Sequence, residues 1–408
     1  MASVSTYRPL LRRILFLLLL LPGLTVWGHL TLTFRHGSSD LIQDYAAATA
    51  LRSGLSIYGE SIARIADTLI PPGSVRLENF HPPFTALLSL PLSRLSYPDA
   101  FTALGVITLL LWVGMIIAVT RRYTLSTTLI LPLLLLWYPF LYATGTGNIS
   151  MVIAAGVTFG ILLAEGRPFT GGALLGLTAA IKLFPALLLV GPALERRWRV
   201  CAGGVCALVV AFALTLLLVP WADVHGYAAH IAARNVEEWS SFIPNMSITG
   251  LVLPLVTVND WIHPLLALPI DCAVRLTTAL SFGAIFLTLF IALRRSITGT
   301  QLLALLAVTM LLASPITWMH IYPVLIVPVA LLYRSDLSHA ERGALLIAIL
   351  CCSLPDVFIA REMSASWAGV GIPRPLFILV KLPIGGLLIL WVLLITPRPT
   401  TCDRHHAG

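Results

Sequence analysis

The chain has 408 residues, of which 58% are hydrophobic and only 11% are charged, and its formal net charge at pH 7 is +8. This apolar excess excludes an ordinary water-soluble protein. The basic residues fall in short clusters between apolar runs, a pattern that reports membrane topology and excludes a nucleic-acid-binding face. Because many of these runs approach the ~20 residues that a helix needs to cross a bilayer, we predict an all-α, polytopic membrane protein.

The first apolar run, Leu10 to Trp27, has three arginines at or just before its start, at positions 8, 12 and 13. No small-x-small cleavage pattern follows it, so an uncleaved first span is favoured over a signal peptide. Placing the basic clusters on the cytoplasmic side predicts about 12 spans with both termini cytoplasmic. A single transmembrane domain over 1–396 then precedes a cytoplasmic tail, 397–408. The predicted spans are 10–28, 99–120, 123–143, 149–164, 168–181, 184–194, 200–219, 272–293, 300–313, 321–333, 341–356 and 376–396.

Two segments depart from simple crossings. Pro83 to Leu95 is apolar, but a crossing there would move Arg121 and Arg122 outside, so we interpret it as re-entrant or interfacial. Ile181 to Pro185 resembles a break between two half-length helices, which is tolerated where protein or a water-filled cavity surrounds it.

Three outer segments are too long for simple turns: 28–82, 221–271 and 358–375. The first has helical periodicity over 45–54 and 61–69. Long structured segments on one face favour a binding or catalytic site there.

Six polar clusters converge on that outer face although they are far apart in sequence. Ionisable groups near lipid are costly and usually mark function. The convergence therefore predicts a site embedded in the membrane. The clusters are Asp44-Tyr45, His81-Pro82-Pro83, Gly147-Asn148, Lys182, Asn245-Met246-Ser247 and Ser314 to His320.

Each cluster also has a structural interpretation. Asp44 either caps the helix that follows or acts as a general base at the edge of a low-dielectric pocket. His81 either binds substrate or merely precedes a helix that starts with proline. Asn148 either caps the next helix or binds a sugar hydroxyl.

Lys182 gives a stronger signal, because it and Lys381 are the only lysines in the chain. A buried ammonium group needs an anion, and phosphate fits; the alternative is snorkelling to the interface. His320 can hold a phosphate oxygen or move a proton, and Trp318 offers a face for sugar stacking, although singly each is also a plausible interface anchor. Glu237 and Glu238 are interpreted as a solvated face.

Other chemistries find no support in the sequence. It contains no phosphate-binding loop, dinucleotide fingerprint, zinc helix or nucleophile elbow. The six cysteines have neither metal spacing nor the pattern of a disulfide framework. We predict no metal site and no cofactor.

The ordered motifs resemble glycosyltransferase family 87, polyprenyl-phosphate-dependent mannosyltransferase-like proteins of the GT-C superfamily. The resemblance covers roughly residues 40 to 330. This sequence departs from the family pattern at two places that bear on the identity of the sugar. Gly147 abuts Asn148 directly, and Met246 stands where glutamine is common in the family. The matching motifs are Asp44-Tyr45, Ser53 to Tyr58, Phe80 to Phe84, Gly147-Asn148, Gly176 to Pro185, Asn245 to Leu251 and Ser314 to His320.

The resemblance implies a GT-C fold with amphipathic helices in the first extracytoplasmic loop, and transfer of a hexose, commonly mannose, from a polyprenyl-phosphate donor to an extracytoplasmic glycan or glycolipid acceptor. We expect a metal-independent, inverting enzyme of the bacterial plasma membrane. Asp44 and His320 would be catalytic, and Lys182 would bind the donor phosphate. The predicted substrate-binding residues are Tyr45, His81, Asn148, Asn245 and Trp318.

Two rival functions remain open on the sequence. A lipid-linked-sugar flippase or small-solute transporter also needs buried polar groups and broken helices, but alternating access predicts polar sites near mid-membrane. A non-catalytic scaffold in envelope assembly would keep the fold without turnover.

Overall fold

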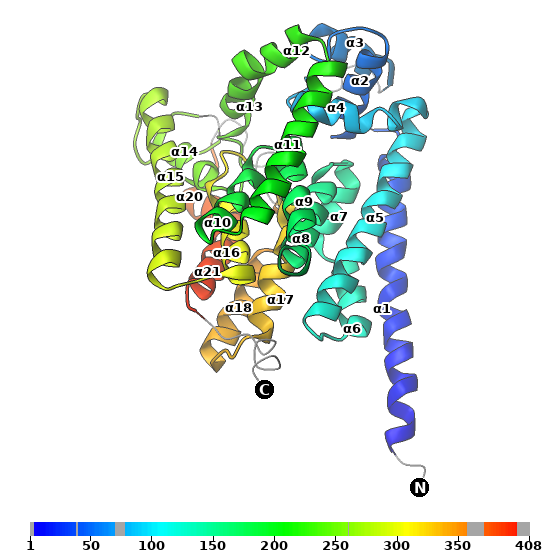
Figure 1. Ribbon diagram of the computed structural model, residues 1–408, viewed down its shortest axis with the longest axis vertical. Coiled ribbons are helices and arrows are strands. Elements are labelled where there is room, and N and C mark those ends of the chain that lie inside the picture. Colours follow the sequence, from blue (N-terminus) through cyan, green and yellow to red (C-terminus); the bar gives the residue numbers. More distant parts are fainter. Residues whose placement is uncertain (1–3, 38–39, 70–77, 260, 357–370, 398–408) are drawn as a thin grey trace.

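The computed structural model describes residues 4–37, 40–69, 78–259, 261–356 and 371–397. Within these ranges all named elements are helices, as predicted, and one isolated β-bridge joins Ile262 to Ile372 (Figure 1). Most of the predicted tail, and residues 358–370 of the third outer segment, lie outside the described residues.

Among the residues that the structure describes, four helices are long and apolar enough to cross a membrane, or five if a bent pair counts as one span. Five shorter apolar helices accompany them, so the structure supports a multi-pass protein but does not confirm the count of 12. The four are α1 (Val4–Phe34, apolar over Phe16–Phe34), α5 (Tyr97–Arg122), α11 (Trp198–Leu218) and α15 (Ile270–Arg294); the bent pair is α20 (Arg374–Val380) with α21 (Leu382–Leu394).

Several predicted spans are broken helices. The predicted span 123–143 is wrong as a single helix, because the chain breaks near Trp137 into α6 (Thr127–Leu135) and α7 (Tyr138–Thr146). Proline accounts for such breaks, since it lacks the amide hydrogen of a continuing helix. The break predicted at Ile181 to Pro185 is confirmed: α9 (Pro168–Ile181) ends there, and η2 (Phe184–Ala186) leads into α10 (Leu187–Leu194).

The core centres on α16 (Gly299–Ala313), in which every residue from Leu302 to Leu312 is buried. A helix that is apolar on all sides belongs in such an interior. Its neighbours include α8 (Ser150–Gly166), α10, α21 and the segment η4 (Met319–Leu325), which continues into α17 (Ile326–Arg334). Around it, α14 (Ile248–Val256) packs on α15, and α18 (His339–Cys351) packs on α21.

Close packing of α9 on α11 depends on glycine. A Cβ on Gly172 would lie 1.9 Å from the carbonyl oxygen of Val200, and one on Gly176 would lie 2.2 Å from that of Gly204. Small residues allow helix backbones to approach in this way inside membranes. This contact fixes the direction of α9 and hence the place where the helix ends at Lys182.

Short helices gather at one end of the molecule, opposite the start of α1 (Figure 1). The first loop forms α2 (Leu41–Arg52) and α3 (Glu60–Leu69); α3 is amphipathic as expected, whereas α2 is buried over most of its length. The segment from Pro83 to Leu95 forms only α4 (Pro83–Ser89) and η1 (Leu92–Arg94), which are too short to cross a bilayer. From the same end, α12 (Trp221–Gly226), the π-helix η3 (Tyr227–Ile231) and α13 (Ala232–Trp239) descend toward the core.

Candidate active site

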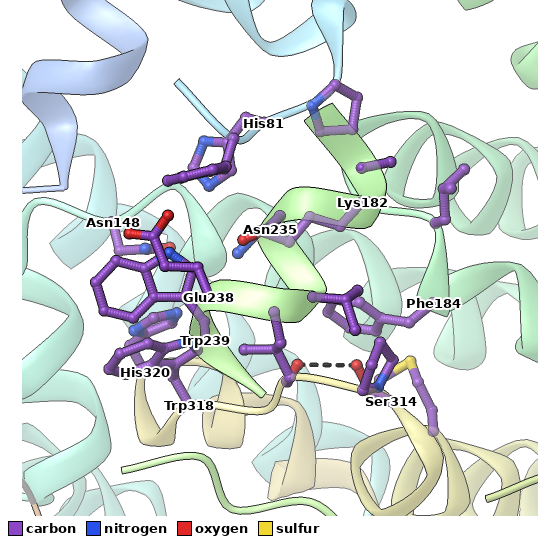
Figure 2. Close-up of a pocket in the computed structure, with 18 of the residues that line it drawn as sticks. His81, Asn148, Lys182, Phe184, Asn235, Glu238, Trp239, Ser314, Trp318 and His320 are labelled. Carbon is purple, nitrogen blue, oxygen red and sulfur yellow. Dashed lines mark hydrogen bonds between the residues drawn. The ribbon is translucent and has the colours of Figure 1, made fainter. Parts of the chain in front are cut away.

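A cavity of about 720 Å³ lies below this cap of short helices. Its walls come from segments distant in sequence: the start of α2, residues 78–82, the junction of α7 with α8, the end of α9, α13, and residues 314–320. Figure 2 shows His81, Asn148, Lys182, Trp318 and His320 gathered around it, so five of the eight predicted site residues share one cavity.

Three carboxyl groups line the cavity: Glu78 pairs with Arg234, Glu238 is exposed, and the third belongs to Asp40. Its Oδ2 accepts a hydrogen bond from Asn148 Nδ2 at 2.8 Å. Gly147 brings the two together: it ends α7 with a left-handed backbone (φ 62°), which glycine adopts without strain, and a Cβ there would lie 2.7 Å from the ring of Phe101. The Asn148 Oδ1 in turn accepts the amide hydrogen of Ser150 at the start of α8. Asn148 therefore both caps a helix and faces the cavity.

Asp40 is held in an environment that suits a base. Burial within the cavity walls raises the pKa of its carboxyl group above the ordinary aspartate value. The hydrogen bond from Asn148 and the nearby charges of His81 and Lys182 act in the opposite direction. A carboxylate that is enclosed yet ionisable is a good acceptor for a hydroxyl proton.

Asp44, which the sequence predicts as the base, does not line the cavity. Its side chain is 2% exposed, and Oδ1 lies 2.7 Å from Nδ1 of His81. His81 does line the cavity and thus stands between Asp44 and the open space. The catalytic role of Asp44 stays a prediction; of the two aspartates, Asp40 is the one that lines the cavity.

Lys182 lies on the cavity wall where α9 has just ended. Its backbone is extended (φ −142°, ψ 136°), so the side chain leaves the helical path at the break before Pro185. Within the described part of the chain, no hydrogen bond or ion pair occupies its ammonium group. A cation so placed is available to an anionic ligand.

The opposite wall is aromatic. Trp318 and His320 stack nearly parallel, with ring centroids 6.2 Å apart and planes 9° apart, and Trp239 of α13 contacts Trp318 at 5.8 Å. His320 is buried, and among the described residues its Nδ1 has no hydrogen-bond partner. The imidazole ring lines the cavity, although Nδ1 itself has almost no solvent-accessible surface.

Two predicted substrate-binding residues do not line the cavity. Tyr45 packs edge-on against Tyr97 in the cap, and its hydroxyl donates to the carbonyl of Leu95 at 2.7 Å. Asn245 is fully buried, and its amide nitrogen donates to the carbonyl oxygens of Ser240 and Pro315. Because its Oδ1 also accepts two backbone amide hydrogens, Asn245 has no capacity left for a sugar.

Asn245 instead fixes the floor of the site. Its Oδ1 accepts the amide hydrogen of Thr317, and the neighbouring Met246 amide donates to the Thr317 carbonyl oxygen at 2.6 Å. Lys381, at the bend between α20 and α21, donates from Nζ to the carbonyl oxygens of Ile243 and Asn245 at 2.6 and 2.7 Å. The non-helical segment that carries Trp318 is thus anchored to the C-terminal helices.

Sequence reasoning missed several cavity residues, above all Asp40 and the α13 side chains. Asp40 lies one helical turn before Asp44, a spacing that places both carboxylates on one face of a helix; this was the available signal. Glu238, interpreted as part of a solvated face, is exposed but also borders the cavity, as Figure 2 shows. The other cavity residues missed are Gln43, Glu78, Tyr142, Tyr227, Asn235 and Trp239.

The cavity also has an apolar side. Phe282 and Ile285 of the membrane-spanning helix α15 line it, as do Leu183 and Phe184 at the break after α9. Phe282 is 68% exposed and Leu183 is 66% exposed. Exposed apolar side chains on a spanning helix suit contact with lipid, so the cavity joins a polar interior to the membrane side of the protein.

Comparison with known proteins adds a family. The sequence pattern of glycosyltransferase family 87 matches residues 79–315, more than half of the chain. A polyprenol-phosphate-mannose-dependent alpha-(1-2)-phosphatidylinositol mannoside mannosyltransferase from Mycolicibacterium smegmatis is 28% identical over 300 residues. That alignment spans 64% of each of the two chains.

Among solved structures, that of ArnT from Cupriavidus metallidurans bound to undecaprenyl phosphate aligns with 93% of this chain and 76% of its own length. The identity is 16% and the TM-score is 0.37, a likeness too weak to support an inference about this chain.

Proposed function

This chain belongs to glycosyltransferase family 87, and from that premise we propose that it transfers a hexose, with mannose the first choice, from a polyprenyl-phosphate donor to an acceptor hydroxyl. The observation that carries the proposal is the meeting of Asp40, Lys182 and His320 in one cavity with an apolar side. A base, a cation and a lipid-facing wall are what this reaction needs. The choice of donor is supported by the mycobacterial relative, which is a polyprenol-phosphate-mannose-dependent enzyme.

The proposed chemistry is a single displacement. Asp40 accepts the proton of the acceptor hydroxyl as its oxygen forms a bond to the anomeric carbon of the donor sugar. The bond between that carbon and the phosphate oxygen breaks, and polyprenyl phosphate leaves with the bonding electrons. Attack from the face opposite the leaving group inverts the anomeric configuration.

We assign the donor phosphate to Lys182 and His320. The ammonium group of Lys182 offsets the charge that grows on the phosphate as the sugar leaves, which is the form of electrostatic stabilisation that most favours a transition state. The ring of His320 lines the same cavity and can donate a hydrogen bond to a phosphate oxygen. With these groups in place we propose that no metal is required, and a chelator should leave the rate unchanged.

The sugar and the acceptor fit the remaining walls. Trp318 and Trp239 offer faces on which a sugar ring can stack. The basic clusters at the other end of the spans favour an extracytoplasmic site in a plasma membrane, with a glycan or glycolipid as the acceptor.

The test is hexose transfer from a synthetic short-chain polyprenyl-phosphate mannose by the purified full chain in lipid nanodiscs. Asp40→Asn should lower the rate by about 10²- to 10⁴-fold, the usual value of a general base, while donor binding persists. Lys182→Met should mainly weaken donor binding. Arg94→Met is a matched control, because it also removes a cation, and Arg94 is exposed in the cap and does not line the cavity.

Three results would contradict the proposal. The first is substantial turnover in Asp40→Asn. The second is unchanged donor affinity in Lys182→Met, which would remove the phosphate assignment. The third is tight donor binding without transfer to any acceptor for mannose, glucose and arabinose donors, which would favour a lipid-sugar flippase.

A further inference from the structure

His81, the partner of Asp44, is held in place by several hydrogen bonds. The His81 amide hydrogen is donated to Asn79 Oδ1 at 3.0 Å, and its carbonyl oxygen accepts the hydroxyl hydrogen of Tyr58 at 2.8 Å. Pro82 and Pro83 follow directly and restrict the backbone. These contacts hold the main chain of His81, and the bond to Asp44 holds its ring at Nδ1.

The bond to Asp44 decides which ring nitrogen faces the cavity. A carboxylate only accepts hydrogen bonds, so Nδ1 of His81 donates to Asp44 and carries a proton. His81 lines the cavity, and no described residue bonds its second nitrogen, Nε2. Asp44 thereby fixes both the tautomer and the orientation of a ring that offers Nε2 to a ligand.

The position of Asp40 indicates what that ligand is. If Asp40 takes the acceptor proton, the attacking oxygen and the anomeric carbon must approach within about 3–3.5 Å of each other beside it. The transferred sugar therefore lies alongside Asp40. His81 lines the same cavity as Asp40, and it contacts Asp44, one helical turn further along α2.

We propose that Asp44 is a positioning residue that holds His81 with Nε2 against a hydroxyl group of the transferred sugar. This inference rests on the proposed function. It gives the two aspartates different tasks: Asp40, at the N-cap of α2, receives the proton, and Asp44, within α2, acts only through His81. Their ligand is the sugar part of the donor, not its phosphate.

A double-mutant cycle on Asp44→Asn and His81→Gln tests this division, with binding and turnover both measured. Each single variant should lose about 10- to 100-fold in transfer, the usual cost of removing a residue that orients a ligand-binding histidine. In the His81→Gln background, Asp44→Asn should cost nothing further, because it acts through the missing ring. Both variants should bind polyprenyl-phosphate mannose more weakly while binding polyprenyl phosphate, which lacks the sugar, as the wild type does.

Asp223→Asn is the matched control. Asp223 is also buried and accepts hydrogen bonds, from Ser56 Oγ and the Ile57 amide, but it does not line the cavity. Its loss should lower thermal stability without changing the preference for the sugar-bearing lipid. An equal change of that preference in Asp223→Asn would overturn the positioning role.

The outcomes separate this inference from the proposed function. If Asp44→Asn abolishes transfer as completely as Asp40→Asn does, both with His81 and with His81→Gln, then Asp44 is the base. That result would overturn the assignment of Asp40 as base and Asp44 as positioning residue. No transfer by the wild type would overturn the proposed function, and the binding cycle would still decide the contact with the sugar. Equal binding of both lipids by the wild type and all variants would show that His81 does not touch the sugar.

Discussion

At the scale of single residues, the site depends on one hydrogen bond between side chains that are 108 positions apart. Asn148 donates to Asp40, and this bond opposes the rise in the Asp40 pKa that burial causes. The sequence indicates Asn148 but not its bond to Asp40. Asp40 and Asp44 share a helix face, and only the insertion of His81 over Asp44 decides which of them reaches the cavity. That insertion is a tertiary contact, which local pattern does not encode.

The Asn148 bond makes a prediction about pH. Asp40 must be ionised to accept a proton, so kcat falls as the pH falls through its pKa, and burial places this limb above the ordinary aspartate range. Asn148→Ala removes an influence that lowers the pKa, so the limb should move to higher pH. The measurement is kcat between about pH 4 and 8. Ser150→Ala is the control, because it removes only a hydroxyl that bonds to Asn148 Oδ1 and leaves the bond to Asp40 in place. If the acid limb does not move in Asn148→Ala, Asp40 is not the titrating base.

At the scale of helices, sequence and structure agree where polarity marks a feature. The break at Lys182 is visible because a lysine and a proline interrupt an apolar run. The break near Trp137 interrupts a uniformly apolar run and leaves little polar signal. Asn245 shows the converse: a lone polar residue among apolar ones resembles a ligand site, but its partners, Pro315 and Thr317, are distant in sequence.

The α9–α11 contact makes a prediction at this scale. Gly176→Ala places a Cβ 2.2 Å from the Gly204 carbonyl oxygen, so the two helices must separate. We expect a loss of about 1–3 kcal/mol in stability, the usual cost of overpacking, and weaker donor binding because Lys182 ends the displaced helix. Thermal unfolding in detergent and donor titration measure the two effects. Gly283→Ala on α15 is the control: it meets nothing within 4 Å and should be neutral or slightly stabilising, so equal effects of the two substitutions would refute the packing argument.

At the scale of the whole molecule, the C-terminal ends of α5 and α15 lie away from the cap of short helices (Figure 1). The positive-inside rule gives this polarity a direction, because arginine pairs end α5 and α15 at 121–122 and 294–295. The cap, and with it the cavity, should then face away from the cytoplasm. A donor whose phosphate sits at that depth can keep its polyprenyl chain in the outer leaflet, which explains why apolar side chains of α15 border a polar cavity.

The orientation is testable with single cysteines in a chain whose six native cysteines are replaced. Glu60→Cys, exposed at the start of α3 in the cap, should react with a membrane-impermeant thiol reagent applied to intact spheroplasts. Ser296→Cys, exposed just after α15, should react only once the membrane is permeabilised. The reverse pattern would place the cavity at the cytoplasmic face, and the acceptor would then have to be sought among cytoplasmic glycans. Labelling at both positions in intact spheroplasts would contradict the passage of α15 across the bilayer, because that helix separates the loop at Ser296 from the cap.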